Sequence, residues 1–150
     1  MSDPRRLVIG VGNPDRGDDG VGRLVARLLR DRVAADVRIV ETDGNAAQVI
    51  ELLQAADCVW LVDAAVSGAP GGTIHRVNCS SGELPPAAPT ASSHGLGVAE
   101  AIALARTLGT LPRRCVVYAV EGEGFEQGGA VSGTVVDAAH EVARRIAVEI

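Results

Sequence analysis

The chain contains no lysine, so its basic side chains are 14 arginines and three histidines. A phosphate-binding P-loop needs a lysine that reaches the phosphates, and this class of nucleotide site is therefore excluded. Cysteine is also scarce. Cys58 and Cys115 lie in apolar runs, Cys79 lies in a predicted loop, and their spacing matches no zinc or thioredoxin-like pattern. We expect buried, reduced thiols.

Long apolar runs and a one-sided charge are missing as well. No stretch approaches the roughly 18 uninterrupted apolar residues of a membrane span, and residues 1–6 lead into a strand-like run without a signal-peptide pattern. The formal net charge is −5, and acidic and basic residues are interspersed without a basic stripe. We expect a cytoplasmic, monomeric protein that binds neither nucleic acid nor membrane.

Apolar residues are abundant and follow two alternating periodicities. With 150 residues and 47% hydrophobic content, the chain is long and apolar enough for one domain over residues 1–150. Strands are predicted at 7–11, 37–40, 59–62, 72–77 and 115–120, and helices at 21–29, 46–53, 96–106 and 134–146. Asn45 is placed to cap the second helix, Gly109 to end the third, and Thr134 with Asp137 to form a capping box on the fourth.

This alternation predicts an α/β fold. The expected architecture is a three-layer sandwich, in which helices flank both faces of a mostly parallel, twisted sheet. Residues 59–62 are continuously apolar, which is typical of a central strand covered on both faces, and Asp63 is expected to end that strand. The less apolar run 72–77 is predicted to be an antiparallel or edge strand.

Acidic residues follow most of the predicted strands. In an open parallel sheet the ligand crevice lies beyond the carboxyl ends of the strands, and helix starts lie at that same edge. The candidates placed there are Asp18, Asp19, Asp43, Asp63, Glu121 and, before the third helix, His94. Two carboxylates and one imidazole suit a borderline divalent cation such as nickel, zinc or iron.

Several of these residues also have a simpler interpretation. Asp18, Asp19 and Asp43 could cap helices, and for Asp15 and Asp18 we favour that role. Asp63 differs, because a carboxylate at the end of a fully apolar strand needs a partner charge or a hydrogen bond, and a functional role is favoured there.

Two interpretations are also open for the histidines and for the acidic, glycine-rich residues 121–125. A lone histidine at a helix start is more often structural, but the sequence around His94 favours function. His75 and His140 stay unassigned, because solvent exposure accounts for both. Residues 121–125 could form either a flexible acidic loop or part of a substrate cleft.

The order of these motifs resembles the hydrogenase maturation proteases. The matching pieces are Gly10-Val11-Gly12-Asn13, Gly17-Asp18-Asp19-Gly20-Val21-Gly22, Asp63-Ala64, Pro70-Gly71-Gly72-Thr73, Ser93-His94, and Glu121-Gly122 with Phe125. The resemblance spans nearly the whole chain. The sequence departs from the family pattern at Asn45, where a second glycine often follows Asp-Gly, and at Gly95, where glutamine often follows the histidine.

The resemblance implies an endopeptidase that removes a C-terminal peptide from the nickel-loaded precursor of a hydrogenase large subunit. It places the metal-contacting residues at Asp19, Asp63 and His94 and a further acidic site residue at Asp43. The nickel would be delivered by the precursor. No serine or cysteine nucleophile with an obvious base is present, so we expect water to attack the scissile carbonyl, assisted by the metal. An aspartate acting as general base is the alternative route.

The competing hypothesis is a metal-binding or nucleotide-binding α/β module without protease activity. A phosphoacceptor signalling domain would need an active-site lysine, which the chain lacks. Gly10 and Gly12 follow a strand as in a dinucleotide site, but Asp15 stands at the third glycine position, and an acidic loop repels phosphates.

Overall fold

The computed structural model describes residues 4–79 and 97–150 as ten elements. In chain order these are β1 (Arg6–Val11), the 3-10 helix η1 (Gly17–Gly20), α1 (Val21–Leu29), β2 (Arg38–Thr42), α2 (Ala46–Gln54), β3 (Cys58–Ala65), β4 (Ile74–Asn78), α3 (Val98–Leu108), β5 (Arg114–Glu121) and α4 (Gly133–Glu149). The predicted alternation of strands and helices is confirmed.

The five strands form one sheet in the order β2-β1-β3-β5-β4. All neighbouring pairs are parallel except β4 with β5, which is antiparallel. The strand expected at 72–77 is therefore both antiparallel and at an edge. The strand expected to be central, β3, lies in the middle of the sheet and is buried along its whole length.

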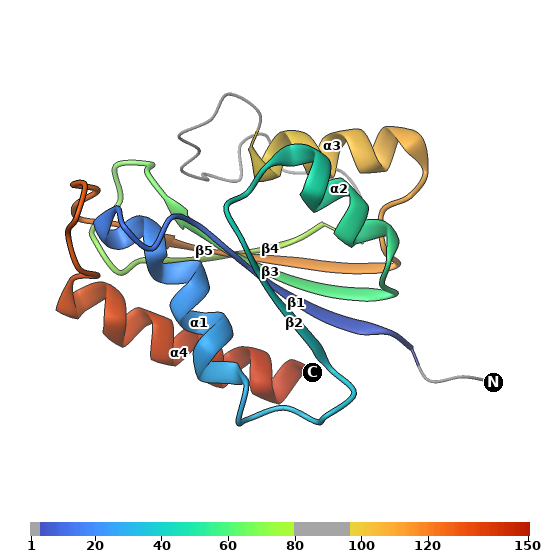
Figure 1. The fold of residues 1–150 in the computed structure, drawn as a ribbon, viewed down its shortest axis with the longest axis horizontal. Helices are drawn as coiled ribbons and strands as arrows, with labels where there is room; N and C mark the ends of the chain where they lie inside the picture. Colours follow the sequence, from blue (N-terminus) through green and yellow to red (C-terminus); the bar gives the residue numbers. More distant parts are fainter. Residues whose placement is uncertain (1–3, 80–96) are drawn as a thin grey trace.

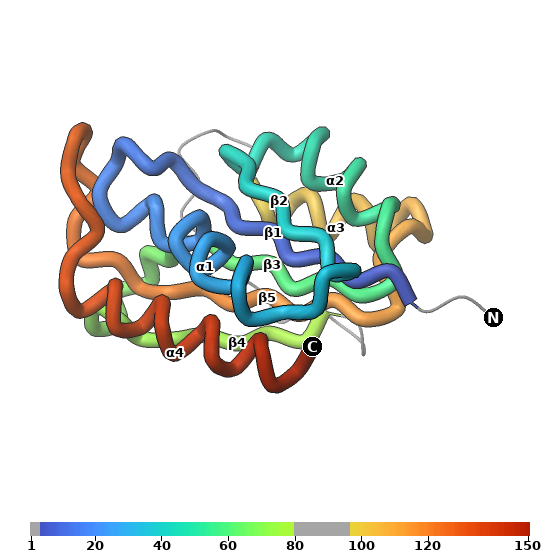
Figure 2. The backbone as a smooth tube through the Cα atoms, turned by 60° about the horizontal axis from the view of Figure 1, so that its bottom comes forward, coloured from blue at the N-terminus to red at the C-terminus, as the bar shows by residue number. Residues whose placement is uncertain are grey.

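Helices cover both faces of the sheet, as predicted (Figure 1). Helices α1 and α4 lie on one face and α2 and α3 on the other, and the turned view separates the two layers (Figure 2). Because side chains alternate along a strand, β3 sends Trp60 and Val62 into the core beneath α1 and α4, and Val59 and Leu61 into the core beneath α2 and α3.

Local sequence signals set the start of α2 and the end of α3. The Asn45 side chain accepts hydrogen bonds from the amides of Ala47 and Gln48, so it caps α2 as predicted. Gly109 ends α3 in the left-handed conformation, with φ of 73°. The capping box predicted at Thr134 is wrong, because α4 already begins at Gly133 and Ser132 is its N-cap residue.

The third strand is longer than predicted. β3 continues through Asp63 to Ala65, because β5 pairs with it as far as Glu121. Asp63 therefore lies inside a paired strand and does not end it.

The prediction of buried, reduced thiols is confirmed, since all three cysteines are free and buried. No helix within residues 4–79 and 97–150 is long and apolar enough to cross a membrane.

Candidate active site

Asp19 is brought to the carboxyl edge of the sheet by the loop after β1. Gly12 has φ of 147°, and a Cβ there would lie 1.8 Å from the Asp19 carbonyl oxygen, so only glycine permits this packing. Gly22 lets α1 approach closely, since its Cβ would lie 2.3 Å from the Val62 carbonyl oxygen of β3. Asp19 is 6% exposed, and its Oδ2 accepts the Asn13 amide at 2.9 Å.

Asp63 lies near Asp19 and has few hydrogen bonds within the described residues. Its side chain is on the face of β3 covered by α2 and α3, because it is two residues beyond Leu61. Its Oδ1 accepts the amide of Ala64 at 2.8 Å. Burial raises the pKa of Asp63 well above its usual value, and the negative charge of Asp19 raises it further. The hydrogen bond expected for a carboxylate in an apolar strand is therefore present.

Asp18 has a different role from the one predicted. Its carboxylate does not cap η1. Instead it accepts the amides of Glu123 at 2.6 Å, Gly124 at 3.0 Å and Ser132 at 2.7 Å, and so ties the β5–α4 loop to the β1–α1 loop. Although burial acts in the opposite direction, these bonds hold the pKa of Asp18 below its usual value. Asp15, given the same prediction, is exposed and makes no side-chain capping bond to η1.

Glu121 and His75 form a second polar cluster on the same face as Asp63. Glu121 is 1% exposed, and its Oε1 lies 3.0 Å from Nε2 of His75. It also accepts the amide of Ser67 at 3.1 Å. Although burial acts to raise it, the bonds from Ser67 and His75 hold the pKa of Glu121 below its usual value. Solvent exposure therefore fails to account for His75, whereas His140 is exposed as expected.

This cluster lies beside Asp63 by strand register. Ala119 of β5 pairs with Asp63 on one side and with His75 on the other, so the three residues form one row across the sheet. The sequence placed Glu121 at this edge but missed Ser67 and His75. The available signal was the alternation of side chains along a strand, which puts His75 on the opposite face of the sheet from Ile74.

Of the remaining predicted site residues, Asp43 lies in the described part of the chain and makes no hydrogen bond with Asp19 or Asp63. Asp43 is exposed, and its Oδ1 accepts the Asn45 amide at 3.1 Å, so it shapes the turn before α2. His94 lies outside the described residues; the chain is described again from Gly97, the N-cap of α3. In the parts of the chain that are described, no three His, Cys, Asp or Glu side chains meet as a metal site.

Comparison with known proteins agrees with the resemblance drawn from the motifs. The family model of the hydrogenase maturation protease HycI matches residues 23–149. The chain is 30% identical over 151 residues to the hydrogenase expression/formation protein HoxM of Azotobacter vinelandii, covering 99% of this chain and 73% of that protein. It is 33% identical to HupD of Thiocapsa roseopersicina, with 80% of this chain and 55% of that protein covered.

Solved structures share the fold over nearly the full chain. The [NiFe] hydrogenase maturation protease HycI from Thermococcus kodakarensis aligns with a TM-score of 0.74 and 27% identity, covering 98% of this chain and 93% of that one. The hydrogenase maturating endopeptidase HybD from E. coli aligns with a TM-score of 0.75 at 21% identity, covering 95% and 89%, and supports the fold. The nucleotide-binding alternative is not favoured. The chain belongs to the hydrogenase maturation protease family, whose members are peptide hydrolases.

Proposed function

We propose that this protein removes a C-terminal peptide from the nickel-loaded precursor of a hydrogenase large subunit. The observation that carries the proposal is Asp63, a buried carboxylate of raised pKa beside a second buried carboxylate, Asp19, at the carboxyl edge of the sheet. Ligands bind at this edge in open α/β sheets. Family membership supplies the reaction class.

Asp63 is suited to move a proton during peptide hydrolysis. Its raised pKa brings the carboxyl group closer to neutral pH, where an acid or base is most effective in proton transfer. In the alternative route, with an aspartate as general base, Asp63 takes a proton from the attacking water, and that proton passes to the leaving amine. Asp19 disfavours a second negative charge beside it and so helps to set this pKa.

The precursor's nickel is treated as part of the substrate. Two neighbouring buried carboxylates are a fitting partial ligand set, because a cation would offset their mutual repulsion. Asp19, Asp63 and His94 are the proposed contacts. When bound, the ion would polarise the scissile carbonyl. Three protein ligands are too few to hold nickel tightly. Cleavage would therefore depend on a precursor that brings the ion with its own thiolates.

The decisive experiment is cleavage of nickel-loaded and nickel-free precursor by the full chain, followed by mass spectrometry of the released peptide. Asp19→Asn and His94→Ala should abolish cleavage of the loaded precursor while leaving the thermal unfolding transition in place. Asp15→Asn is the matched control, since Asp15 is exposed and hydrogen-bonds through its backbone. Cleavage of the nickel-free precursor at the normal rate would refute the substrate-borne metal.

We also propose that the protein is a cytoplasmic monomer. Free, buried cysteines are typical of a reducing compartment. The large apolar side chains exposed in the described parts of the chain are spread over four positions, Val66, Leu104, Leu108 and Val148. A molar mass near 15.4 kDa by light scattering would support the monomer, and a mass twice as large would contradict it.

A further inference from the structure

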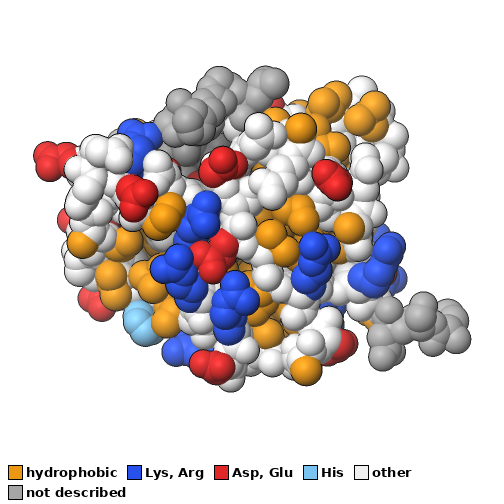
Figure 3. Space-filling model, in the orientation of Figure 1, with side chains coloured by type: hydrophobic (Ala, Val, Ile, Leu, Met, Phe, Trp, Pro, Cys, Tyr) orange, Lys and Arg blue, Asp and Glu red, His pale blue; other side chains and the backbone are white. Residues whose placement is uncertain are grey.

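Three arginines of one helix face converge on a single glutamate beside the sheet edge. Arg27 Nε lies 3.1 Å from Glu41 Oε1, Arg30 Nη2 lies 3.1 Å from Oε2, and Arg23 Nη1 lies 4.0 Å from Oε1. We call these four residues the arginine patch. Its formal charge is +3 − 1 = +2, in a chain whose net charge is −5. Figure 3 shows basic side chains gathered around an acidic one on this face.

The glutamate leaves most of the arginine donors available. The side chains of Arg27 and Arg30 are 58% and 50% exposed, whereas that of Glu41 is 17% exposed, so positive charge faces the solvent. Each guanidinium carries five N–H donors. A carboxylate from a partner can therefore be held by two parallel hydrogen bonds on either arginine.

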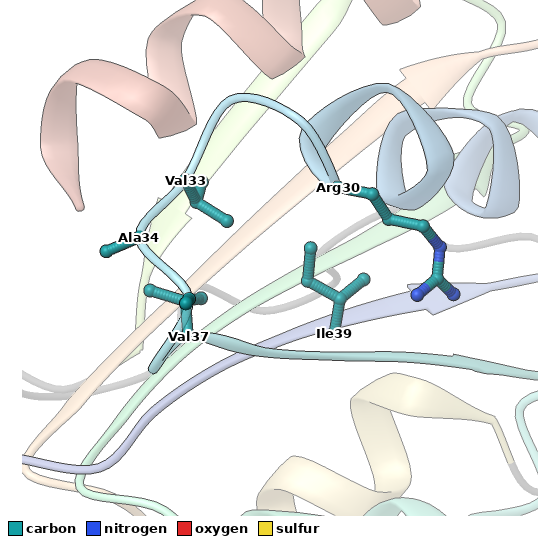
Figure 4. Close-up of a pocket in the computed structure, with 6 residues that line it drawn as sticks. Arg30, Val33, Ala34, Val37 and Ile39 are labelled. Atoms are coloured by element: carbon teal, nitrogen blue, oxygen red, sulfur yellow. The ribbon is translucent and has the colours of Figure 1, made fainter.

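An open hollow lined mostly by aliphatic residues lies next to the arginine patch. It has a volume of about 200 Å³ and is lined by Arg30 together with Val33, Ala34, Ala35, Val37 and Ile39. Figure 4 shows Val33 and Val37 on the α1–β2 connection, Ile39 on β2 and the Arg30 side chain running past Ile39. The hollow has room for one small side chain, which would contact aliphatic side chains and lie beside the positive charge of Arg30.

The same surface includes the outer edge of β2. This strand is first in the sheet order and pairs with β1 on its inner side. The unpaired backbone groups of an edge strand can accept an extended segment of another protein. Five residues of strand span about 17 Å, enough for a short peptide.

The surface also continues into the candidate active site. At the carboxyl end of β2 the Thr42 carbonyl accepts the amide of Gly12 at 2.9 Å. Arg23 Nε donates to the Gly12 carbonyl at 2.5 Å, and Gly12 packs against the backbone of Asp19. A segment that lies along β2 therefore extends to the sheet edge at which Asp19 lies.

We propose that the arginine patch, the hollow and the outer edge of β2 together bind an acidic, extended segment of the precursor. The segment adds to β2 as a strand, places carboxylates at Arg27 and Arg30 and sets one small side chain in the hollow. This inference rests on the proposed function. The surface supplies affinity and orientation, and Asp63 supplies chemistry.

The first test compares cleavage kinetics of two charge-matched double variants on the nickel-loaded precursor. R27E/R30E should raise KM about tenfold or more and leave kcat within about twofold, because the changed residues bind substrate away from the reacting bond. R113E/R145E changes the net charge equally at exposed positions outside the patch and should leave KM unchanged. Raising the salt concentration should increase KM for the unmodified protein and have less effect on R27E/R30E.

A third variant controls for damage to β2. R27E/R30E/E41R restores opposite charges within the patch and lowers its formal charge from +2 to 0. It should unfold at nearly the unmodified temperature and still show the raised KM. Recovery of normal KM in this variant, or an equal KM in R27E/R30E and R113E/R145E, overturns the proposal.

Hydrogen exchange separates this inference from the proposed cleavage. Binding of the precursor should slow exchange of the Ile39 and Glu41 amides, which face outward because the alternate residues Val40 and Thr42 bond to β1. If the precursor binds and protects β2 but is not cleaved, the proposed function fails and the docking surface stands. If it is cleaved with no protection of β2, the docking surface fails alone. Protection that appears without precursor and grows with protein concentration would identify a second copy as the occupant and overturn the assignment.

Discussion

Asp18 and Asp63 are both shielded from solvent, but their pKa values are shifted in opposite directions. They are 1% and 2% exposed. Three backbone amides and the Ser132 hydroxyl donate to Asp18, and its pKa lies below the usual value despite burial. Asp63 accepts the amide of its own neighbour, Ala64, and faces the charge of Asp19, so its pKa lies well above the usual value. Burial raises the pKa of both carboxylates, and Asp18 stays ionised because its hydrogen-bond donors outweigh that effect.

This difference distinguishes a carboxylate that stabilises loops from one that we propose to be reactive. The charge of Asp18 stabilises two loops, and this role requires no contact with substrate. The ionised form of Asp63 is disfavoured by its surroundings, as is common for groups that take part in proton transfer. Substitutions at the two positions should therefore change different measured quantities.

The largest effect is expected from Asp63→Asn. Cleavage of the nickel-loaded precursor should fall by about 10³-fold or more, since an amide cannot accept the proton from water. The free energy of unfolding should rise by about 1 kcal/mol, because the substitution removes an unfavourable buried charge. Kinetics and thermal unfolding of the same preparation measure both. A variant that is inactive and also strongly destabilised would make Asp63 a structural residue like Asp18.

Asp18→Ala should mainly affect stability. The variant leaves the amides of Glu123, Gly124 and Ser132 without their acceptor, and we expect a loss of about 3 kcal/mol in the free energy of unfolding. Urea unfolding followed by circular dichroism measures it. Asp57→Ala is the control, since the carboxylate of Asp57 is bonded at the surface. Equal stability of the two variants would show that the loop bonds contribute little.

Glu121→Gln should have an intermediate effect. The neutral amide keeps the shape of the buried side chain but weakens its bonds to His75 and Ser67, which we expect to lower the free energy of unfolding by about 1 to 2 kcal/mol. His75→Gln retains a donor and should have a smaller effect. Thermal unfolding of the two variants ranks them, and the reverse order would contradict this account of the cluster.

The pH dependence of stability should separate the two aspartates by sign. Asp18 has a lowered pKa in the folded state, so its contribution is present above the unfolded value of about 3.9 and is lost as pH falls through the lower folded value. Asp63 has a raised pKa, so its contribution is present below about 3.9 and is lost as pH rises to the folded value. The free energy of unfolding of the metal-free protein should be measured against pH, together with those of Asp18→Asn and Asp63→Asn. Each variant should remove the slope that its aspartate contributes, and the two slopes should have opposite signs.

The smallest effect is expected from Asp43→Asn. Asp43 is exposed and accepts one bond from the Asn45 amide, which asparagine can also accept. We expect a change below about 0.5 kcal/mol in the free energy of unfolding and less than about tenfold in the cleavage rate. A loss of cleavage comparable to that of Asp63→Asn would place Asp43 in the active site, as the family resemblance implies.

The sequence by itself determined the layered fold and the sheet edge at which the candidate site residues Asp19 and Asp63 lie. Strand and helix periodicities are local, so they predicted the sheet, its central strand β3 and the cap at Asn45. The rule that ligands bind beyond the carboxyl ends of parallel strands then gave a set of candidates that includes Asp19 and Asp63. The order of the motifs identified the family.

The tertiary structure decided the roles of the individual carboxylates. The donors to Asp18 lie 105 to 114 residues further along the chain, and Ser67 lies 54 residues before Glu121. No local pattern carries such pairings, because loops from distant segments meet only when the sheet has assembled. The extension of β3 past Asp63 likewise depends on pairing with β5. A carboxylate's position can therefore be predicted from its own strand, whereas its charge state depends on donors that only the folded chain brings to it.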